Sequence, residues 1–259
     1  MHRLRSLPLL LGSCPGGGRA PSWADMEERL SPGQERLRRL ESRIEMVRER
    51  IVRAGGDPER VRVIAVTKGH DLEAVRLALE TGLVDLGENY ADDLVRKASA
   101  LESDVPFRWH YLGRVQRNKV PRLVEWVTLW QSVDRLEAGA AIARRMPGAA
   151  VLVQVNLDSF GPPVQVPGVR GGCAPDELEE LVHGLKSFGL AVEGLMAVGP
   201  HGFPEESRRG FSWLAARRDE LGLAELSMGM TDDLEVAVSE GSTMVRIGRA
   251  LFGDRPDSG

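Results

Sequence analysis

The chain has 259 residues, a length at which an α/β barrel still forms a single domain. Hydrophobic residues make up 42% and charged residues 28%, which is ordinary globular usage and argues against collagen-like, largely disordered and multi-span membrane architectures. The formal net charge of −4 lacks the basic excess that a wide nucleic-acid-binding surface requires, so we expect neither a nucleic-acid nor a membrane partner. The two cysteines, Cys14 and Cys173, are too few for a disulfide framework, which favours a reducing, cytoplasmic compartment.

Residues 1–25 precede the organised part of the sequence. Arg3 and Arg5 stand before an apolar run that resembles a lipoprotein signal. A functional apolar region needs roughly 7–15 residues, whereas this one is about five residues long and contains Pro8. We interpret residues 1–25 as a disordered leader or a mis-assigned start before Met26, and we expect residues 26–259 to form the folded domain.

A helical pattern begins at residues 31–32 and ends at the glycine-rich residues 54–58. Its apolar residues recur at spacings of three and four, as on the buried stripe of an amphipathic helix: Leu37, Leu40, Ile44, Val47 and Ile51. Arginine and glutamate alternate on the other faces, which is typical of a solvated surface. The pattern predicts one helix ahead of the main fold.

Short β-rich runs then alternate with helical stretches. The first strand is predicted over residues 61–66, and the helix after it is capped by Asp71 and ends at Gly82. Seven further strands are predicted over residues 83–86, 107–112, 127–133, 149–156, 192–198, 225–228 and 244–247. The helical patterns between them cover residues 90–101, 115–125, 135–146, 175–188, 205–221 and 232–240.

Eight strands interleaved with helices favour an α/β fold, a single (β/α)8 TIM-like barrel with an extra N-terminal helix. An open doubly wound sheet is the alternative. It is disfavoured because the first strand is followed by Thr67-Lys68-Gly69-His70, not by a Gly-x-Gly-x-x-Gly motif.

Lys68 is the sharpest candidate for chemistry, because barrel enzymes carry their sites at the carboxyl ends of the strands. A lysine directly after an apolar strand would point into a partly dry mouth, where its amine can attack a carbonyl. A solvated loop lysine fits the same position equally well.

Residues 227–231 follow the seventh strand and precede an acidic run. Hydroxyls and backbone N–H groups at the start of a helix form a phosphate cradle, and the loops after strands seven and eight are a frequent place for one. The same residues also fit a simply capped helix with Thr231 as the N-cap. Gly248, after the eighth strand, is a second place where backbone can approach an anion.

Arg246 lies in an apolar strand and therefore needs a partner, either an acidic residue on a neighbouring strand or a ligand. His110 has no second ligand at metal spacing, so we expect no metal site. Asn89 and Asn156 are turn formers or polar contacts at the mouth. A lysine, a phosphate cradle and a buried arginine together suggest pyridoxal 5′-phosphate (PLP) held as a Schiff base.

The chain also resembles the pyridoxal phosphate homeostasis protein family from about residue 34 to residue 255. The motifs that carry the resemblance are AVTK at 65–68, GENY at 87–90, WHYLG at 109–113, SVD at 132–134, QVN at 154–156, GLM at 194–196, LSMGM at 226–230 and VRIG at 245–248. The resemblance implies a barrel like the N-terminal domain of alanine racemase.

The resemblance further implies PLP on Lys68, an arginine at Arg246 facing the pyridine nitrogen, and phosphate contacts around Ser227, Thr231 and Gly248. The remaining candidate cofactor contacts lie in the same motifs or beside them: Asn89, His110, Asn156, Met196, Met228, Gly229 and Arg249. Arg249 stands where the family often has threonine, so a guanidinium would replace a hydroxyl. Residues 159–167 are longer than the corresponding family loop.

Three functions are weighed. The resemblance implies a non-catalytic carrier that buffers PLP in the cell and delivers it to apo PLP-dependent enzymes, and we expect this role, with a monomer or weak dimer and no catalytic residue. A racemase-like enzyme needs an opposing tyrosine from a second domain, for which the chain leaves no room. A Schiff-base aldolase would use Lys68 with Glu88 as the acid–base partner.

Overall fold

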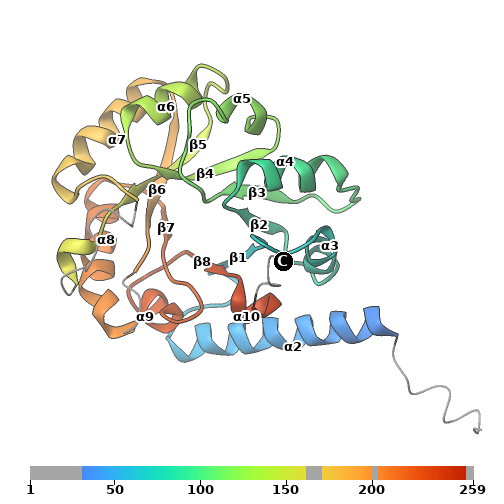
Figure 1. The fold of residues 1–259 in the computed structure, drawn as a ribbon. Coiled ribbons are helices and arrows are strands. Elements are labelled where there is room, and N and C mark those ends of the chain that lie inside the picture. Colours follow the sequence, from blue (N-terminus) through green and yellow to red (C-terminus); the bar gives the residue numbers. More distant parts are fainter. Residues whose placement is uncertain (1–30, 162–170, 200–203, 255–259) are drawn as a thin grey trace, which may run out of the picture. The chain divides into compact units, whose positions relative to one another are not determined.

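In the computed structural model, which describes residues 31–161, 171–199 and 204–254, parallel strands close into a barrel (Figure 1). Each strand pairs with the next along the chain, and the last pairs with the first. The strands are β1 Arg62–Val66, β2 Asp85–Glu88, β3 Arg108–Tyr111, β4 Val127–Val133, β5 Ala150–Val155, β6 Ala191–Ala197, β7 Glu225–Ser227 and β8 Met244–Ile247. The predicted (β/α)8 barrel is therefore confirmed, and the open sheet is wrong.

A helix or helical turn follows each strand. The α-helices after the strands are α3 Leu72–Glu80, α4 Ala91–Ala100, α5 Val120–Leu123, α6 Leu136–Ala143, α7 Leu178–Ser187, α8 Arg208–Glu220, α9 Leu234–Ser239 and α10 Arg249–Phe252. Short 3-10 turns are η1 Asp158–Phe160, η2 Pro175–Glu177 and η3 Pro204–Ser207. The predicted cap of α3 is confirmed, since the Asp71 carboxylate accepts a hydrogen bond from the Ala74 N–H at 3.0 Å.

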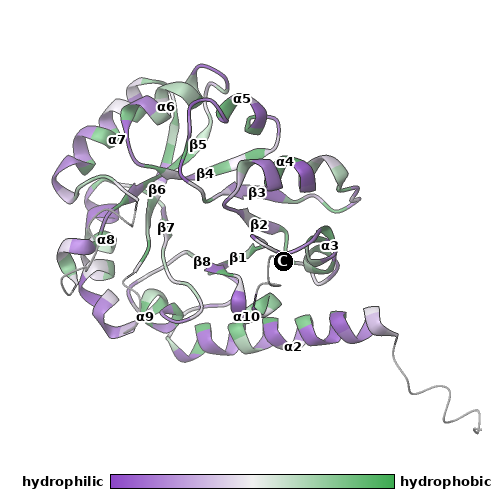
Figure 2. Ribbon diagram, viewed as in Figure 1, coloured by the Kyte–Doolittle hydropathy of each residue, from purple (hydrophilic) through white to green (hydrophobic). Residues whose placement is uncertain are grey.

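The helix α2 Pro32–Arg53 confirms the predicted N-terminal helix. Its buried residues are four of the five that the spacing singles out: Leu40, Ile44, Val47 and Ile51. The mixed colouring of α2 in Figure 2 reflects its apolar and polar faces. Arg50 pairs with Glu235 of α9 at 2.6 Å, and Arg43 donates to the carbonyl of Leu251 in α10 at 2.9 Å. These bonds join α2 to the last two helices, α9 and α10.

The hydrophobic core has an outer part between strands and helices and a smaller part inside the barrel. The inner cluster consists of Ile64, Leu129, Leu152, Met196 and Met244. Successive residues of a strand face opposite sides of a sheet. Residues two positions further along three of these strands, Gln131, Gln154 and Arg246, therefore also point into the barrel.

The second strand begins two residues later than predicted, over Asp85–Glu88 and not over residues 83–86. Leu83 belongs to the turn after α3, where its N–H donates to the carbonyl of Ala78. Both carboxylates of the strand are buried with cationic partners, so the sequence pattern there does not show the alternation of a half-exposed strand.

The predicted leader over residues 1–25 and most of the long loop at 159–167 lie outside the described residues. Among the residues that the structure describes, no helix is long and apolar enough to cross a membrane.

Candidate functional site

A cavity of about 520 Å³ opens at the carboxyl ends of the strands. Residues from seven of the strands or from the loops that follow them meet there, and β4 is the exception among the described lining residues. Seven of the predicted site residues line it: Lys68, Asn89, Met196, Thr231, Arg246, Gly248 and Arg249. The topology thus brings together residues that are up to 181 positions apart in the sequence (Lys68 to Arg249).

The turn after β1 holds Lys68 at the edge of this cavity. Thr67 is fully buried, and its carbonyl accepts hydrogen bonds from the Lys97 ammonium at 2.7 Å and from the His70 N–H at 3.0 Å. Gly69 has a φ of +75°, a backbone conformation that favours glycine. The backbone on both sides of Lys68 is therefore fixed, while the side chain itself is half-buried.

Glu88 forms a fully buried ion pair with Lys97, with Oε2 and Nζ 2.6 Å apart. The other carboxylate oxygen accepts from the backbone N–H groups of Asn89 at 2.8 Å and Tyr90 at 3.3 Å. Glu88 is not among the lining residues of the cavity. The expectation that Glu88 serves as an acid–base partner of Lys68 is therefore wrong, because its carboxylate is already neutralised inside the protein.

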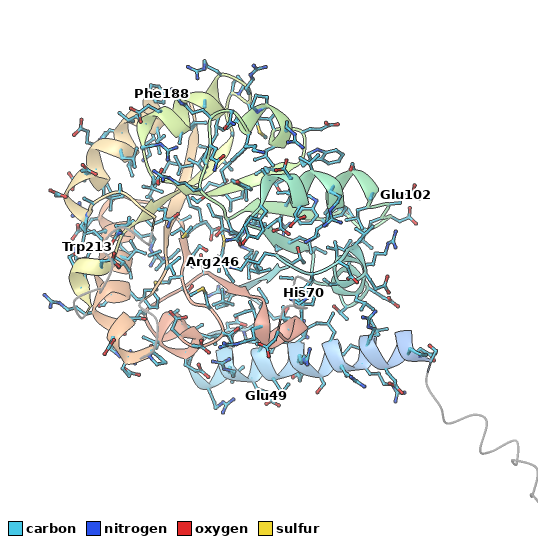
Figure 3. All side chains as sticks on the ribbon, in the orientation of Figure 1. Glu49, His70, Glu102, Phe188, Trp213 and Arg246 are labelled. Carbon is cyan, nitrogen blue, oxygen red and sulfur yellow. The ribbon has the colours of Figure 1, made fainter. Side chains whose placement is uncertain are left out.

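Arg246 is 6% exposed and lies near the centre of the barrel (Figure 3). Its Nη1 donates to the carbonyl and the hydroxyl of Ser227, both at 2.8 Å, and Nη2 donates to the carbonyl of Ala197 at 2.7 Å. No ion pair joins Arg246 to a carboxylate within the described chain, so the alternative of an acidic partner on a neighbouring strand is wrong. Three of its five N–H groups are used, which leaves two for the cavity that it lines.

The charge of Arg246 survives this burial. Desolvation lowers the pKa of Arg246 to about 10, and the negative charge of Asp233 opposes the decrease. The guanidinium is therefore cationic at neutral pH, and it presents a positive charge and unsatisfied donors to the cavity.

Ser227 and His110 do not line the cavity but lie below it in the barrel interior. Ser227 Oγ donates to Gln131 Oε1 at 2.7 Å, and Gln131 Nε2 lies 2.8 Å from His110 Nδ1. His110 Nε2 lies 2.8 Å from Asp85, whose carboxylate also accepts two bonds from Arg108 at 2.6 and 2.7 Å. Of these two predicted contacts, Ser227 therefore bonds to Arg246 directly, and His110 is linked to it through Gln131 and Ser227.

Three further predicted contacts lie outside the cavity lining. Asn156 accepts the Asp158 N–H at 2.8 Å in a local turn. Met228 is fully buried in the outer core. Gly229 has a φ of +91°, and a Cβ there would come within 2.5 Å of Ala237. All three residues follow the last residue of a strand, where local turns and core packing, not the direction of the strand, decide where each side chain lies.

The phosphate-cradle prediction concerns the loop after β7 and the start of α10. Thr231 is not the N-cap of α9, which begins three residues later at Leu234 after Asp233. Its hydroxyl instead accepts the Ala250 N–H at 3.3 Å, which links this loop to α10. Arg249 forms an ion pair with Asp232, and both residues line the cavity.

Nine lining residues are absent from the sequence-based list: Val66, His70, Leu112, Gln154, Val198, Met230, Asp232, Gly253 and Asp254. Alternation along β5 could have identified Gln154, two residues after the interior Leu152. His70 packs against Phe252 with ring centroids 5.3 Å apart, a contact across 182 positions that no local pattern indicates. Among the described residues, no group of three or more His, Cys, Asp or Glu side chains could hold a metal ion.

The sequence is similar to known proteins over most of the described chain. The sequence profile of the alanine racemase N-terminal domain matches residues 36–256. The pyridoxal phosphate homeostasis protein of Aquifex aeolicus is 39% identical over 184 residues, covering 67% of this chain and 78% of the relative. That of Pseudomonas aeruginosa is 37% identical over 183 residues, covering 67% and 76%.

A solved structure of PipY from Synechococcus elongatus, with PLP bound, superposes with a TM-score of 0.71 at 29% identity. The match covers 83% of this chain and the whole of PipY. The chain therefore belongs to the pyridoxal phosphate homeostasis protein family, whose barrel is that of the alanine racemase N-terminal domain.

Proposed function

We propose that this protein binds PLP in the barrel-mouth cavity as a Schiff base on Lys68, and that it buffers and delivers the cofactor in the cytoplasm without turning over a substrate. The observation that carries the proposal is Arg246, a buried cation with two donors left for the cavity that Lys68 also lines. PLP offers the aldehyde, ring nitrogen and phosphate that such a site would recognise. The relative PipY holds PLP in the same fold.

Besides Lys68 and Arg246, other lining residues suit the phosphate of this cofactor. Thr231, Gly248 and Arg249 supply a hydroxyl, an unobstructed backbone and a guanidinium for the phosphate. A Cβ on Gly248 would lie 3.2 Å from the Val66 carbonyl, so a side chain there would crowd the strand end. A volume of about 520 Å³ is within the roughly 300–1,000 Å³ of small-molecule sites.

Arg246 favours holding the cofactor over catalysis. An arginine is a permanent donor, so a pyridine nitrogen facing it accepts a hydrogen bond and stays unprotonated. PLP supplies an electron sink to amino-acid chemistry, and an unprotonated ring nitrogen weakens that sink. The site therefore suits a carrier.

The tyrosines support the same conclusion. The chain contains two, and neither lines the cavity in the part that the structure describes. Tyr90 is 54% exposed. Tyr111 packs edge-on against Trp130, and burial, aided by the charge of Glu88, raises the pKa of Tyr111 to about 12. Neither is poised to exchange a proton opposite Lys68, as a racemase requires.

Lys68→Ala tests the attachment. Wild-type protein mixed with PLP should acquire the visible absorbance of an imine, and borohydride reduction should leave a stable adduct on Lys68 in peptide mass spectrometry. Lys68→Ala should lose both signals, whereas Lys186→Ala, on the exposed surface of α7, should keep them. A wild-type protein that takes up no PLP would refute the proposal.

Turnover separates a carrier from an enzyme. Loaded protein is mixed with a panel of amino acids, and racemisation, transamination and decarboxylation are followed. Any turnover that Lys68→Ala abolishes would overturn the carrier role. Transfer to an apo PLP-dependent enzyme should be faster than release into a trap if delivery is direct.

A further inference from the structure

A continuous line of hydrogen bonds crosses the barrel interior beneath the cavity. We call it the interior chain, and its members are Arg246, Ser227, Gln131, His110 and Asp85. They come from β8, β7, β4, β3 and β2, and all are 8% exposed or less. Gln131 Nε2 also lies 3.7 Å from the sulfur of Met244, which places this line among the apolar residues of the inner cluster.

The interior chain has one consistent order of donors, and it starts from Asp85. Burial alone would raise the pKa of Asp85, but hydrogen bonds from His110 and Arg108 outweigh it and hold that pKa well below its ordinary range. The carboxylate is therefore only an acceptor, so His110 Nε2 carries a proton. In neutral imidazole Nδ1 is then an acceptor, and it accepts from the Gln131 amide N–H.

The same reasoning fixes the donor and the acceptor in each remaining hydrogen bond up to Arg246. The Gln131 amide donates to His110 through nitrogen, so its oxygen faces Ser227 and accepts the hydroxyl proton. The lone pairs of Ser227 Oγ are then left for Arg246 Nη1, which cannot accept a bond. With an imidazolium at His110 the Gln131 amide would have to flip, and the Ser227 proton would lose its acceptor.

We propose that Gln131 and His110 are positioning residues that orient the Arg246 guanidinium, and through it set the protonation state of a pyridine nitrogen in the cavity. This inference rests on the proposed PLP site. The order of donors keeps Ser227 an acceptor toward Arg246, so the guanidinium holds one plane and directs its remaining N–H groups toward the cavity. His110 thereby acts on the ligand through three intervening side chains, those of Gln131, Ser227 and Arg246, without touching it.

The 15N resonance of the PLP ring nitrogen tests this inference, because it would not change if Gln131 and His110 only stabilised the fold. PLP labelled with 15N in the ring is bound to wild type, Gln131→Met and His110→Phe, and the ring-nitrogen resonance is compared. Gln131→Met keeps the side-chain volume roughly constant, and His110→Phe replaces one flat ring by a somewhat larger apolar one. We expect a resonance of an unprotonated nitrogen in wild type, a displaced resonance in both variants, and about tenfold weaker PLP binding, which equals about 1.4 kcal/mol.

Ser132→Ala is the matched control, because Ser132 is the buried neighbour of Gln131 on β4 and, in the part of the chain that the structure describes, its hydroxyl donates to the Gly113 carbonyl and to no member of the interior chain. It should leave the ring-nitrogen resonance at the wild-type position. A wild-type resonance in both Gln131→Met and His110→Phe would overturn the inference while leaving PLP binding intact.

A second measurement needs neither PLP nor a variant. The 15N spectrum of the His110 ring in the unloaded protein should show a neutral imidazole protonated at Nε2 at pH 7. A proton on Nδ1, or an imidazolium, would overturn the order of donors, even if Gln131→Met fails to fold. A wild-type protein that binds no PLP would instead refute the proposed function, whatever the tautomer.

Discussion

Two buried cations in this barrel are stabilised in opposite ways. Lys97, on the outer side between α4 and β2, is fully buried and faces the Glu88 carboxylate at 2.6 Å. Arg246, in the interior, is 6% exposed, and its hydrogen bonds within the described residues go to carbonyl and hydroxyl oxygens of Ser227 and Ala197.

The difference separates a structural charge from a binding charge. In the outer pair the two charges neutralise each other, so nothing remains to attract a ligand, and removing one partner leaves the other uncompensated. In the interior the neutral oxygens orient the guanidinium but leave its charge in place. A charge held by dipoles is available to the cavity, and this availability marks Arg246 as part of the site.

The largest expected effect comes from breaking the outer pair. Lys97→Met should lower the free energy of unfolding by about 3–5 kcal/mol, because Glu88 is left buried without a counter-charge. Urea unfolding measures it. The double variant Lys97→Met/Glu88→Gln should recover much of this loss, because no buried charge remains. A double variant no more stable than Lys97→Met would contradict the assignment.

Substitution of Asp85, at the end of the interior chain away from the cavity, should have the next largest effect on the free energy of unfolding, and this effect should depend on pH. Asp85→Asn should lower the free energy of unfolding by about 2 kcal/mol at pH 7, since the carboxylate accepts charged hydrogen bonds. The pKa of Asp85 is lowered in the folded state, so this stabilisation is complete above the unfolded value near pH 4 and is lost as the pH falls further.

Urea unfolding of wild type and Asp85→Asn at pH 7, 5 and 3 tests this expectation. The gap between the two proteins should narrow only at the lowest pH. Asp104→Asn, at an exposed loop position, serves as the control and should change stability little at any of these values. A gap of constant size across the series would show that the Asp85 charge contributes nothing.

Arg246→Met tests whether the interior cation contributes to binding more than to stability. We expect the unloaded protein to lose only about 1 kcal/mol, because the lost hydrogen bonds are offset by removal of a desolvated charge. PLP should no longer raise the melting temperature as it does for wild type. Destabilisation as large as that of Lys97→Met would show that both cations are structural.

The smallest effect concerns the exposed pair of Arg249 and Asp232, whose side chains are 56% and 72% exposed. Such pairs contribute about 0.2–1 kcal/mol, so Asp232→Asn should leave stability nearly unchanged. It should release Arg249 and increase the affinity for inorganic phosphate about two- to fivefold, as measured by calorimetry. Asp219→Asn, which removes the partner of Arg218 on α8, should change neither quantity. Weaker phosphate binding in Asp232→Asn would exclude Arg249 as an anion contact.

The alternation of strands and helices could be predicted because it depends on the local spacing of apolar residues. Apolar runs with period two and amphipathic runs with period 3.6 identify the elements around Lys68 and Arg246 without reference to distant residues. The placement of these two residues at strand ends then follows from the barrel topology alone. Boundaries were less predictable, as in β2, where buried carboxylates disguise the strand.

What the sequence by itself determined was the barrel and the pairing of a strand-end lysine with an apolar-strand arginine. Only the tertiary structure decided which neighbouring polar residues face the cavity. Glu88, His110 and Ser227 carry side chains suited to a ligand, yet Lys97, Asp85 and Gln131 already satisfy them. The physical reason is distance along the chain, because hydrogen-bond partners from separate strands meet only once the barrel has closed.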